Sequence, residues 1–100
     1  MGRPFYAYVL LCSDGSYYTG HTDDLEKRVA EHQHGLGSRY TARRTPVSLV
    51  WSEAFADRDQ ATAVEGMIKG WTRAKKQALI MGDFEAISVL ARKTNWGDGQ

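Results

Sequence analysis

The chain has 100 residues, and its 42% hydrophobic and 25% charged residues exclude the disordered and collagen-like classes. Its formal net charge is +1, so the total charge alone does not indicate a nucleic-acid partner. The single Cys12 excludes an internal disulfide, and neither a signal peptide nor an apolar run of roughly 20 residues is visible. We therefore expect one cytoplasmic domain over residues 1–100, with its core at about 5–80 and no membrane association.

The first elements are predicted to form a β-hairpin. Residues 5–12 are aromatic and β-branched, as strands are, and the Asp-Gly pair at 14–15 indicates a turn before a second strand over 17–21. A two-residue loop would point Tyr8 and Tyr18 to opposite faces of the sheet. One additional loop residue, with the glycine in a left-handed bulge conformation, places both on one face. We therefore predict a three-residue loop.

Capping patterns and apolar periodicity predict the later elements. The first is a helix that is capped by Asp23 and ends near Gly35, followed by a polar loop over 35–45 and a strand over 47–55. A helix capped by Asp57 comes next, and after a break at Gly70 and Thr72 a second helix continues to Gly82. A short helix over 83–91 precedes a frayed tail. The predicted fold is α+β, a small three-stranded antiparallel sheet flanked by helices. We expect Tyr17, Trp51 and Trp71 to lie in the core.

Two features of the sequence suggest a catalytic site. Tyrosines are crowded on the hairpin, and Arg28 and His32 are four residues apart, which places them on one face of the first helix. Arginine is a fixed-charge ligand for phosphate, and histidine can move a proton near neutral pH.

Together the motifs resemble those of the GIY-YIG nuclease superfamily. They are Tyr6-Ala7-Tyr8, Tyr18-Thr19-Gly20, Arg28-x-x-x-His32 and then Glu65. The resemblance covers about residues 5–80 and is nearest to the small stand-alone bacterial proteins, which residues 12–20, 38–41 and 65–76 also resemble. It implies the GIY-YIG endonuclease fold.

The resemblance also implies roles for these residues. Tyr8, Tyr18, Arg28 and His32 would be catalytic, and Glu65 would hold one Mg²⁺ or Mn²⁺. A single carboxylate suffices because Mg²⁺ keeps several waters. Tyr8 would be the general base, with its pKa lowered by cationic surroundings, although Tyr18 remains an alternative proton carrier.

Two positions depart from the family pattern. His21 stands where the excision-repair relatives have a lysine, so its role is open. The late asparagine of many relatives has no clear match, because Gln77 lies near that place and Asn95 lies too far along.

Basic residues gather in two stretches without acidic residues, 39–50 and 66–82, which is typical of a surface that follows a nucleic-acid backbone. The residues expected to contact the substrate are Tyr6, Gly20, His21, Arg39, Arg43, Arg44, Lys69, Arg73, Lys75 and Lys76. The expected partner is DNA, whether single-stranded, duplex or branched, and a protein partner could supply targeting.

The sequence thus predicts a Mg²⁺-dependent DNA endonuclease of low sequence specificity, acting in repair, recombination or defence. The alternative is a nucleic-acid-binding module that keeps the fold without cutting. A third possibility is an interaction domain whose tyrosines only pack. It is disfavoured because such a domain would not be expected to retain all five candidate site residues, which are Tyr8, Tyr18, Arg28, His32 and Glu65.

Overall fold

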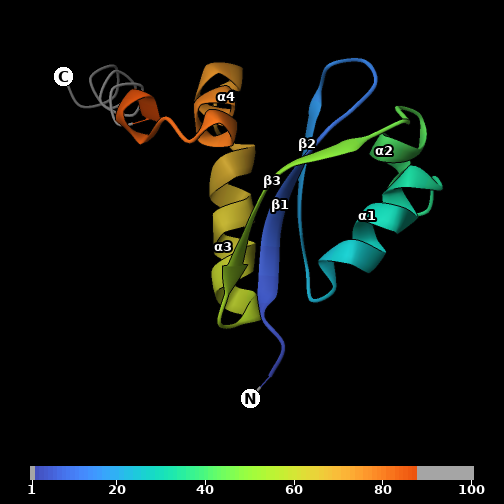
Figure 1. Ribbon diagram of the computed structural model, residues 1–100, viewed down its shortest axis with the longest axis horizontal. Coiled ribbons are helices and arrows are strands. Elements are labelled where there is room, and N and C mark those ends of the chain that lie inside the picture. Colours follow the sequence, from blue (N-terminus) through green and yellow to red (C-terminus); the bar gives the residue numbers. More distant parts are fainter. Residues whose placement is uncertain (1, 88–100) are drawn as a thin grey trace. The chain divides into compact units, whose positions relative to one another are not determined.

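The computed structural model describes residues 2–87, and contacts divide the chain into two compact units, Met1–Lys69 and Gly70–Gln100. In the first unit a sheet lies between helices on its two faces (Figure 1). Its elements are β1 (Phe5–Leu11), β2 (Tyr17–Thr22), α1 (Leu25–Gln33), α2 (Arg39–Ala42), β3 (Ser48–Phe55) and α3 (Arg58–Lys69). The second unit contains α4 (Arg73–Met81). The three strands are antiparallel in the order β2-β1-β3, so the predicted α+β fold is confirmed.

The hairpin between β1 and β2 has the predicted three-residue loop. The N–H of Gly15 donates to the carbonyl of Cys12 (2.9 Å), and the N–H of Cys12 donates to Ser16 (2.8 Å). Gly15 has φ +85°, the left-handed conformation that a glycine adopts without steric cost. Tyr18 therefore pairs with Leu10 of β1 and points to the same face as Tyr8.

Each face of the sheet is covered by a different helix. On one face Tyr8 and Leu10 form a buried cluster against which Leu25 and Val29 of α1 pack. The alternate residues of β1 point to the opposite face, which α3 covers (Figure 1). Because β1 is the central strand, it is buried from both sides, whereas β2 and β3 are edge strands.

Three aromatic residues are half-buried rather than in the core as predicted, and the edge position explains two of them. Tyr17 and Trp51 lie on the edge strands β2 and β3, where one side is open to solvent. Trp71 follows the end of α3 at Lys69, so it is not part of that helix's apolar face.

Two helix caps were predicted, and the structure confirms the one at α3 but not the one at α1. Asp57 caps α3 as predicted, accepting from the N–H of Gln60 at 2.9 Å. The cap of α1 is Asp24, which accepts from the N–H of Lys27 at 3.2 Å, and not Asp23. Thr22 sets this position, because its hydroxyl accepts from the N–H of Asp24 and holds the chain just before the helix.

The predicted loop over 35–45 is corrected by the structure, because it contains the short helix α2. Ser38 caps this helix and accepts from the N–H of Thr41 at 3.1 Å. Four helical residues show no apolar periodicity, which is why the pattern did not predict them. The helix buries Thr41 completely, which matters for the site described below.

In the second unit, α4 begins and ends where predicted. Thr72 caps its start and Gly82, at φ +74°, ends it in the left-handed conformation. Residues 84–87 begin the predicted short helix, and the rest of it, with the tail that includes Asn95 and Trp96, lies outside the described residues. None of the helices seen within 2–87 combines the length and the apolarity needed to cross a membrane.

Candidate active site

Three of the predicted catalytic side chains form one cluster. The hydroxyl of Tyr8 on β1 lies 2.8 Å from Nε2 of His32 on α1. The ring of Tyr18 on β2 is centred 5.1 Å from the imidazole and 6.5 Å from the Tyr8 ring. Tyr8 is 2% exposed and His32 is fully buried. The Tyr8–His32 hydrogen bond is therefore shielded from water.

Gly20 makes room for the Tyr8 hydroxyl. It pairs with Tyr8 across β1 and β2, and a Cβ at this position would lie 2.5 Å from Tyr8 Oη. Any larger residue would displace the buried phenol from His32. The Tyr18-Thr19-Gly20 motif therefore needs its glycine for a steric reason.

Glu65 reaches the site from the other face of the sheet. It lies on α3, and its carboxylate oxygens are 2.5 Å from Nδ1 of His21 and 2.5 Å from Nζ of Lys69. His21 is on β2 but points to the α3 face, opposite to Tyr18. Because β2 is an edge strand, groups from both faces meet around it.

These groups line one cleft of about 190 Å³. The lining residues are Tyr8, Tyr18, Gly20, His21, Arg28, Gly37 and Glu65. Arg28, on α1, is half-buried there and its guanidinium lies 3.4 Å from the Glu31 carboxylate. The cleft thus brings together the Tyr8 phenol, which is hydrogen-bonded to the buried imidazole of His32 behind it, a guanidinium and a carboxylate.

The expectation that cationic surroundings lower the pKa of Tyr8 is wrong. Burial and the neighbouring Tyr18 raise the pKa of Tyr8 above its ordinary value of about 10, and Arg28 opposes this only in part. Tyr8 is therefore protonated at neutral pH. It can accept a proton from water only while it passes its own proton to another group.

His32 can take that proton. Burial lowers the pKa of His32 below its usual value of about 6.5, and Arg28 lowers it further, whereas Glu31 acts in the opposite direction. The imidazole is therefore neutral at pH 7. Tyr8 and Tyr18 also face it, and neither carries a positive charge.

The lowered pKa of His32 makes stability depend on pH. The folded protein binds fewer protons than the unfolded chain, so its free energy of unfolding decreases as the pH falls from about 6.5 through the folded-state pKa. We expect His32→Gln to reduce this slope, by up to about 1.4 kcal/mol per pH unit. Urea unfolding at several pH values between about 5 and 7.5 measures it. His34→Gln makes the same change at an exposed position and is the control, so it should keep the wild-type slope. If both variants had the same slope, the prediction would be contradicted.

Glu65 is suited to hold a cation. Burial opposes its ionisation, but hydrogen bonds from Lys69 and His21 outweigh that and lower the pKa of the carboxyl. Within residues 2–87 no group of three or more His, Cys, Asp or Glu side chains is placed to hold a metal ion. One ionised carboxylate beside an open cleft fits Mg²⁺, which keeps several waters. A bound cation would compete with Lys69 and His21 for the carboxylate.

Of the three arginines predicted to contact phosphates between residues 39 and 44, two are free to face solvent and one is bound to another part of the protein. Arg39 and Arg43 are exposed on and beside α2. Arg44 instead binds Asp14 of the hairpin turn at 2.9 Å, and its guanidinium lies 3.8 Å from the centre of the Tyr40 ring. Its main effect in the structure is to tie α2 to the hairpin, and its contact with substrate stays a prediction.

The other predicted basic contacts lie on α3 and α4. Lys69 lies beside Glu65, as described above. Arg73, Lys75 and Lys76 belong to the second unit, where the ammonium of Lys75 lies 4.5 Å from the centre of the Trp71 ring. Their contact with substrate also stays a prediction.

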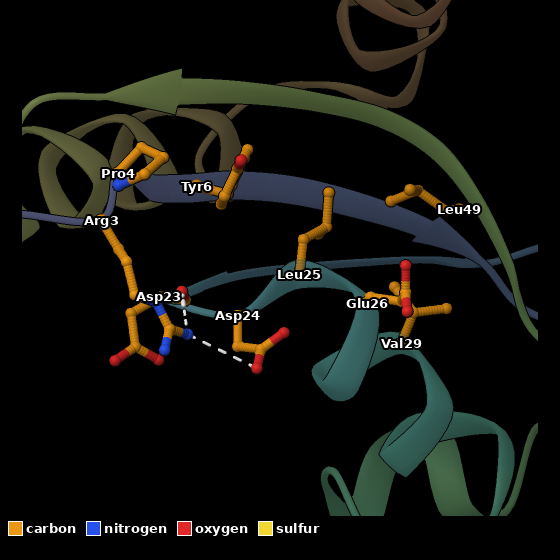
Figure 2. Close-up of a pocket in the computed structure, with 9 residues that line it drawn as sticks. All are labelled: Arg3, Pro4, Tyr6, Asp23, Asp24, Leu25, Glu26, Val29 and Leu49. Carbon is orange, nitrogen blue, oxygen red and sulfur yellow. Dashed lines mark hydrogen bonds and ion pairs between the residues drawn. The ribbon is translucent and has the colours of Figure 1, made fainter.

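Tyr6 lines a second and larger cavity, of about 640 Å³, rather than the cleft (Figure 2). Apolar side chains of α1 and β3, among them Leu25 and Leu49, also line it. At one end Arg3 donates to the carbonyl of Asp23 at 2.9 Å and pairs with Asp24 at 3.4 Å (Figure 2). A role for Tyr6 in the cleft stays a prediction without a contact to support it.

Three residues of the site were given no role from the sequence, although residues 38–41 belong to the family resemblance. Nδ1 of His32 lies 2.8 Å from the hydroxyl of Thr41, which is itself 2.9 Å from the hydroxyl of Ser38. Gly37 lies against the imidazole, since a Cβ there would be 2.3 Å from Nδ1. The sequence signal for this arrangement is the serine–threonine cap of α2.

Comparisons with known proteins identify the family of this chain. The family model described as the GIY-YIG catalytic domain matches residues 4–78. A UPF0213 protein of Lacticaseibacillus paracasei is 47% identical over 78% of this chain and 88% of that protein. A UPF0213 protein of Halobacterium salinarum is 50% identical over 74% of this chain and 96% of its own length.

Solved structures show the same fold. The solution structure of a protein from E. faecalis is 40% identical, with a TM-score of 0.55 over 79% of this chain and 84% of the other. That of a UPF0213 protein from Bacillus halodurans is also 40% identical, with a TM-score of 0.52 over 78% and 83% of the two chains. The chain belongs to the GIY-YIG catalytic domain family, and within it to the UPF0213 proteins.

Proposed function

We propose that this protein is a Mg²⁺-dependent endonuclease that hydrolyses phosphodiester bonds of DNA. The observation that carries the proposal is the convergence, in one cleft, of Tyr8 with its hydrogen bond to buried His32, the guanidinium of Arg28 and the ionised carboxylate of Glu65. Each group matches one requirement of the reaction, namely an activated water, a bound phosphate and stabilisation of developing charge.

The proton would move through Tyr8 to His32. As water approaches phosphorus, it gives a proton to Tyr8 Oη while Tyr8 gives its own proton to Nε2 of the neutral His32. The water oxygen forms the new bond to phosphorus, and the bond to the leaving sugar oxygen breaks. The leaving oxygen takes a proton from solvent, and His32 later returns its proton to solvent through Tyr8.

The other groups would bind the reacting phosphate. Arg28 presents a permanent charge and several donors to the phosphate oxygens. Glu65 would hold Mg²⁺, and the ion, when bound, supplies charge stabilisation at the phosphoryl and leaving oxygens. Tyr18, next to His32 in the cleft wall, would orient the water.

We also propose a substrate preference and a cellular setting for this activity. The arginines at 39 and 43 are exposed and suited to bind phosphates, which carry no sequence information. We therefore expect low sequence specificity, with single-stranded or branched DNA as the preferred substrate, in repair, recombination or defence inside the cell.

The test is a cleavage assay with single-stranded, duplex and branched DNA, with Mg²⁺ or Mn²⁺ and with EDTA. Wild type should cut at least one substrate only when metal is present. Arg28→Ala should lower the rate by about 10²-fold, because it removes charge stabilisation of the transition state. Arg43→Ala is the control, since its exposed side chain lies outside the cleft lining and should change mainly binding.

Two results would overturn the proposal. Cleavage that survives Arg28→Ala at the wild-type rate would show that this cleft is not the site. Salt-sensitive DNA binding without cleavage of any substrate would instead identify a nucleic-acid-binding module that keeps the fold.

A further inference from the structure

The imidazole of His32 is enclosed by polar partners on both of its nitrogens. Nε2 faces the Tyr8 hydroxyl and Nδ1 faces the Thr41 hydroxyl, each at 2.8 Å. His32 and Thr41 are both fully buried, and Gly37 covers the ring beside Nδ1. Water is therefore not the partner of either nitrogen, and the protein itself decides which one carries the hydrogen.

The contacts of Thr41 decide between the two neutral tautomers. Its Oγ1 donates to the carbonyl of Ser38 at 3.4 Å and lies 2.9 Å from the Ser38 hydroxyl. If Thr41 gives its only hydrogen to that carbonyl, its oxygen can accept from both Nδ1–H of His32 and the Ser38 hydroxyl. All these contacts are then satisfied together. If Thr41 donated to Nδ1 instead, the contact with the carbonyl would be lost.

We infer that Ser38 and Thr41 hold neutral His32 in the tautomer with hydrogen on Nδ1, so that the unprotonated Nε2 faces Tyr8 as a proton acceptor. The opposite tautomer would present Nε2–H to Tyr8, and the imidazole could not take the phenol proton. Thr41 is thus a positioning residue, acting through His32. This catalytic consequence rests on the proposed function, whereas the tautomer itself does not.

The same arrangement also suits the protonated imidazole. After Nε2 takes a proton, Nδ1–H continues to donate to Thr41, and Nε2–H donates to Tyr8 Oη. Both nitrogens keep their partners, so no side chain has to turn during the transfer. The Ser38 hydroxyl completes this series of hydrogen bonds. It donates to the Thr41 hydroxyl and accepts a hydrogen bond from the backbone N–H of Thr41 at 3.1 Å.

The first experiment observes the tautomer without any substrate. Long-range ¹H–¹⁵N NMR spectra of the histidine rings at pH 7.5 distinguish a hydrogen on Nδ1 from one on Nε2. Wild type should show His32 with Nδ1–H and a bare Nε2. Thr41→Ser keeps the hydroxyl and should give the same spectrum. In Thr41→Val the acceptor is gone, and the His32 signals should change to the Nε2–H pattern. A wild-type spectrum with Nε2–H would overturn the inference, even if the valine variant failed to fold.

The second experiment connects the tautomer to catalysis. Thr41→Val should lower the cleavage rate by about 10- to 100-fold at pH 7.5, part of the roughly 10²–10⁴-fold that general base catalysis contributes. Thr41→Ser should restore it to within about threefold of wild type. The Thr41→Val pH–rate profile should also lose the wild-type acid limb set by His32.

The two experiments fail in distinguishable ways. A changed tautomer in Thr41→Val with unchanged cleavage would overturn the positioning role and leave the proposed function intact. The Nδ1–H tautomer in a wild type that cuts nothing would support the assignment of the tautomer and refute the proposed function.

Discussion

Glu65→Gln is expected to lower metal-dependent cleavage by about 10³-fold while DNA binding changes little. The substitution keeps the shape of the side chain and removes the charge that would attract Mg²⁺. Loss of several kcal/mol of charge stabilisation at the transition state corresponds to that factor. Cleavage rates at saturating DNA, together with binding measured in EDTA, separate catalysis from affinity.

This substitution should have little effect on folding. Lys69, which pairs with Glu65, is more than half exposed, so its ammonium can return to water. Glu53→Gln is the matched control, since it makes the same chemical change at an exposed position of β3, away from the residues that line the cleft. The control should cut like wild type. Cleavage by Glu65→Gln at the wild-type rate would exclude this carboxylate as the metal ligand.

Gly20→Ala and Gly37→Ala are each expected to destabilise the fold by about 1–3 kcal/mol, the usual cost of overpacking. The added methyl group would lie 2.5 Å from Tyr8 Oη in the first variant and 2.3 Å from His32 Nδ1 in the second. Both rings are buried and cannot move away without breaking their shared hydrogen bond. Urea unfolding measures the loss, and cleavage should fall in both variants as well.

Gly66→Ala is the control for these glycines. It lies within α3, where an added Cβ meets nothing within 4 Å, so alanine should stabilise the helix by about 0.5–1 kcal/mol. If all three variants lost similar stability, the cause would be a general sensitivity to added methyl groups. The steric explanation at the site would then be wrong.

Local signals predicted most of the fold. The register of the hairpin followed from one requirement, that Tyr8 and Tyr18 share a face, together with the Asp-Gly turn. Capping side chains located the start of α3, and the position of α1 differed by one residue because Thr22 holds the preceding turn. Helix α2 was missed since it is stabilised by its cap and by burial of Thr41, which a periodic pattern does not reveal.

The site was predictable in its residue types but not in its electrostatics. The motifs identified Tyr8 and His32, and the structure brings them together at hydrogen-bond distance. The direction of the Tyr8 pKa shift depends on how deeply the ring is buried, and a sequence shows nearby charges without showing burial. Similarly, Arg44 could be identified as basic, but its partner Asp14 is 30 residues earlier and is set by the fold.

The position of β2 at the edge of the sheet has a consequence for how such a site can vary. The phenol and imidazole are held by the α1 side of the sheet, and the carboxylate by α3 on the other side. A change of packing beneath α1 can therefore move the phenol and imidazole while the carboxylate on α3 keeps its position, and the reverse also holds. Substitutions beneath α1 or beneath α3 would therefore adjust the Tyr8–His32 pair and the Glu65 carboxylate separately, without replacing the groups themselves.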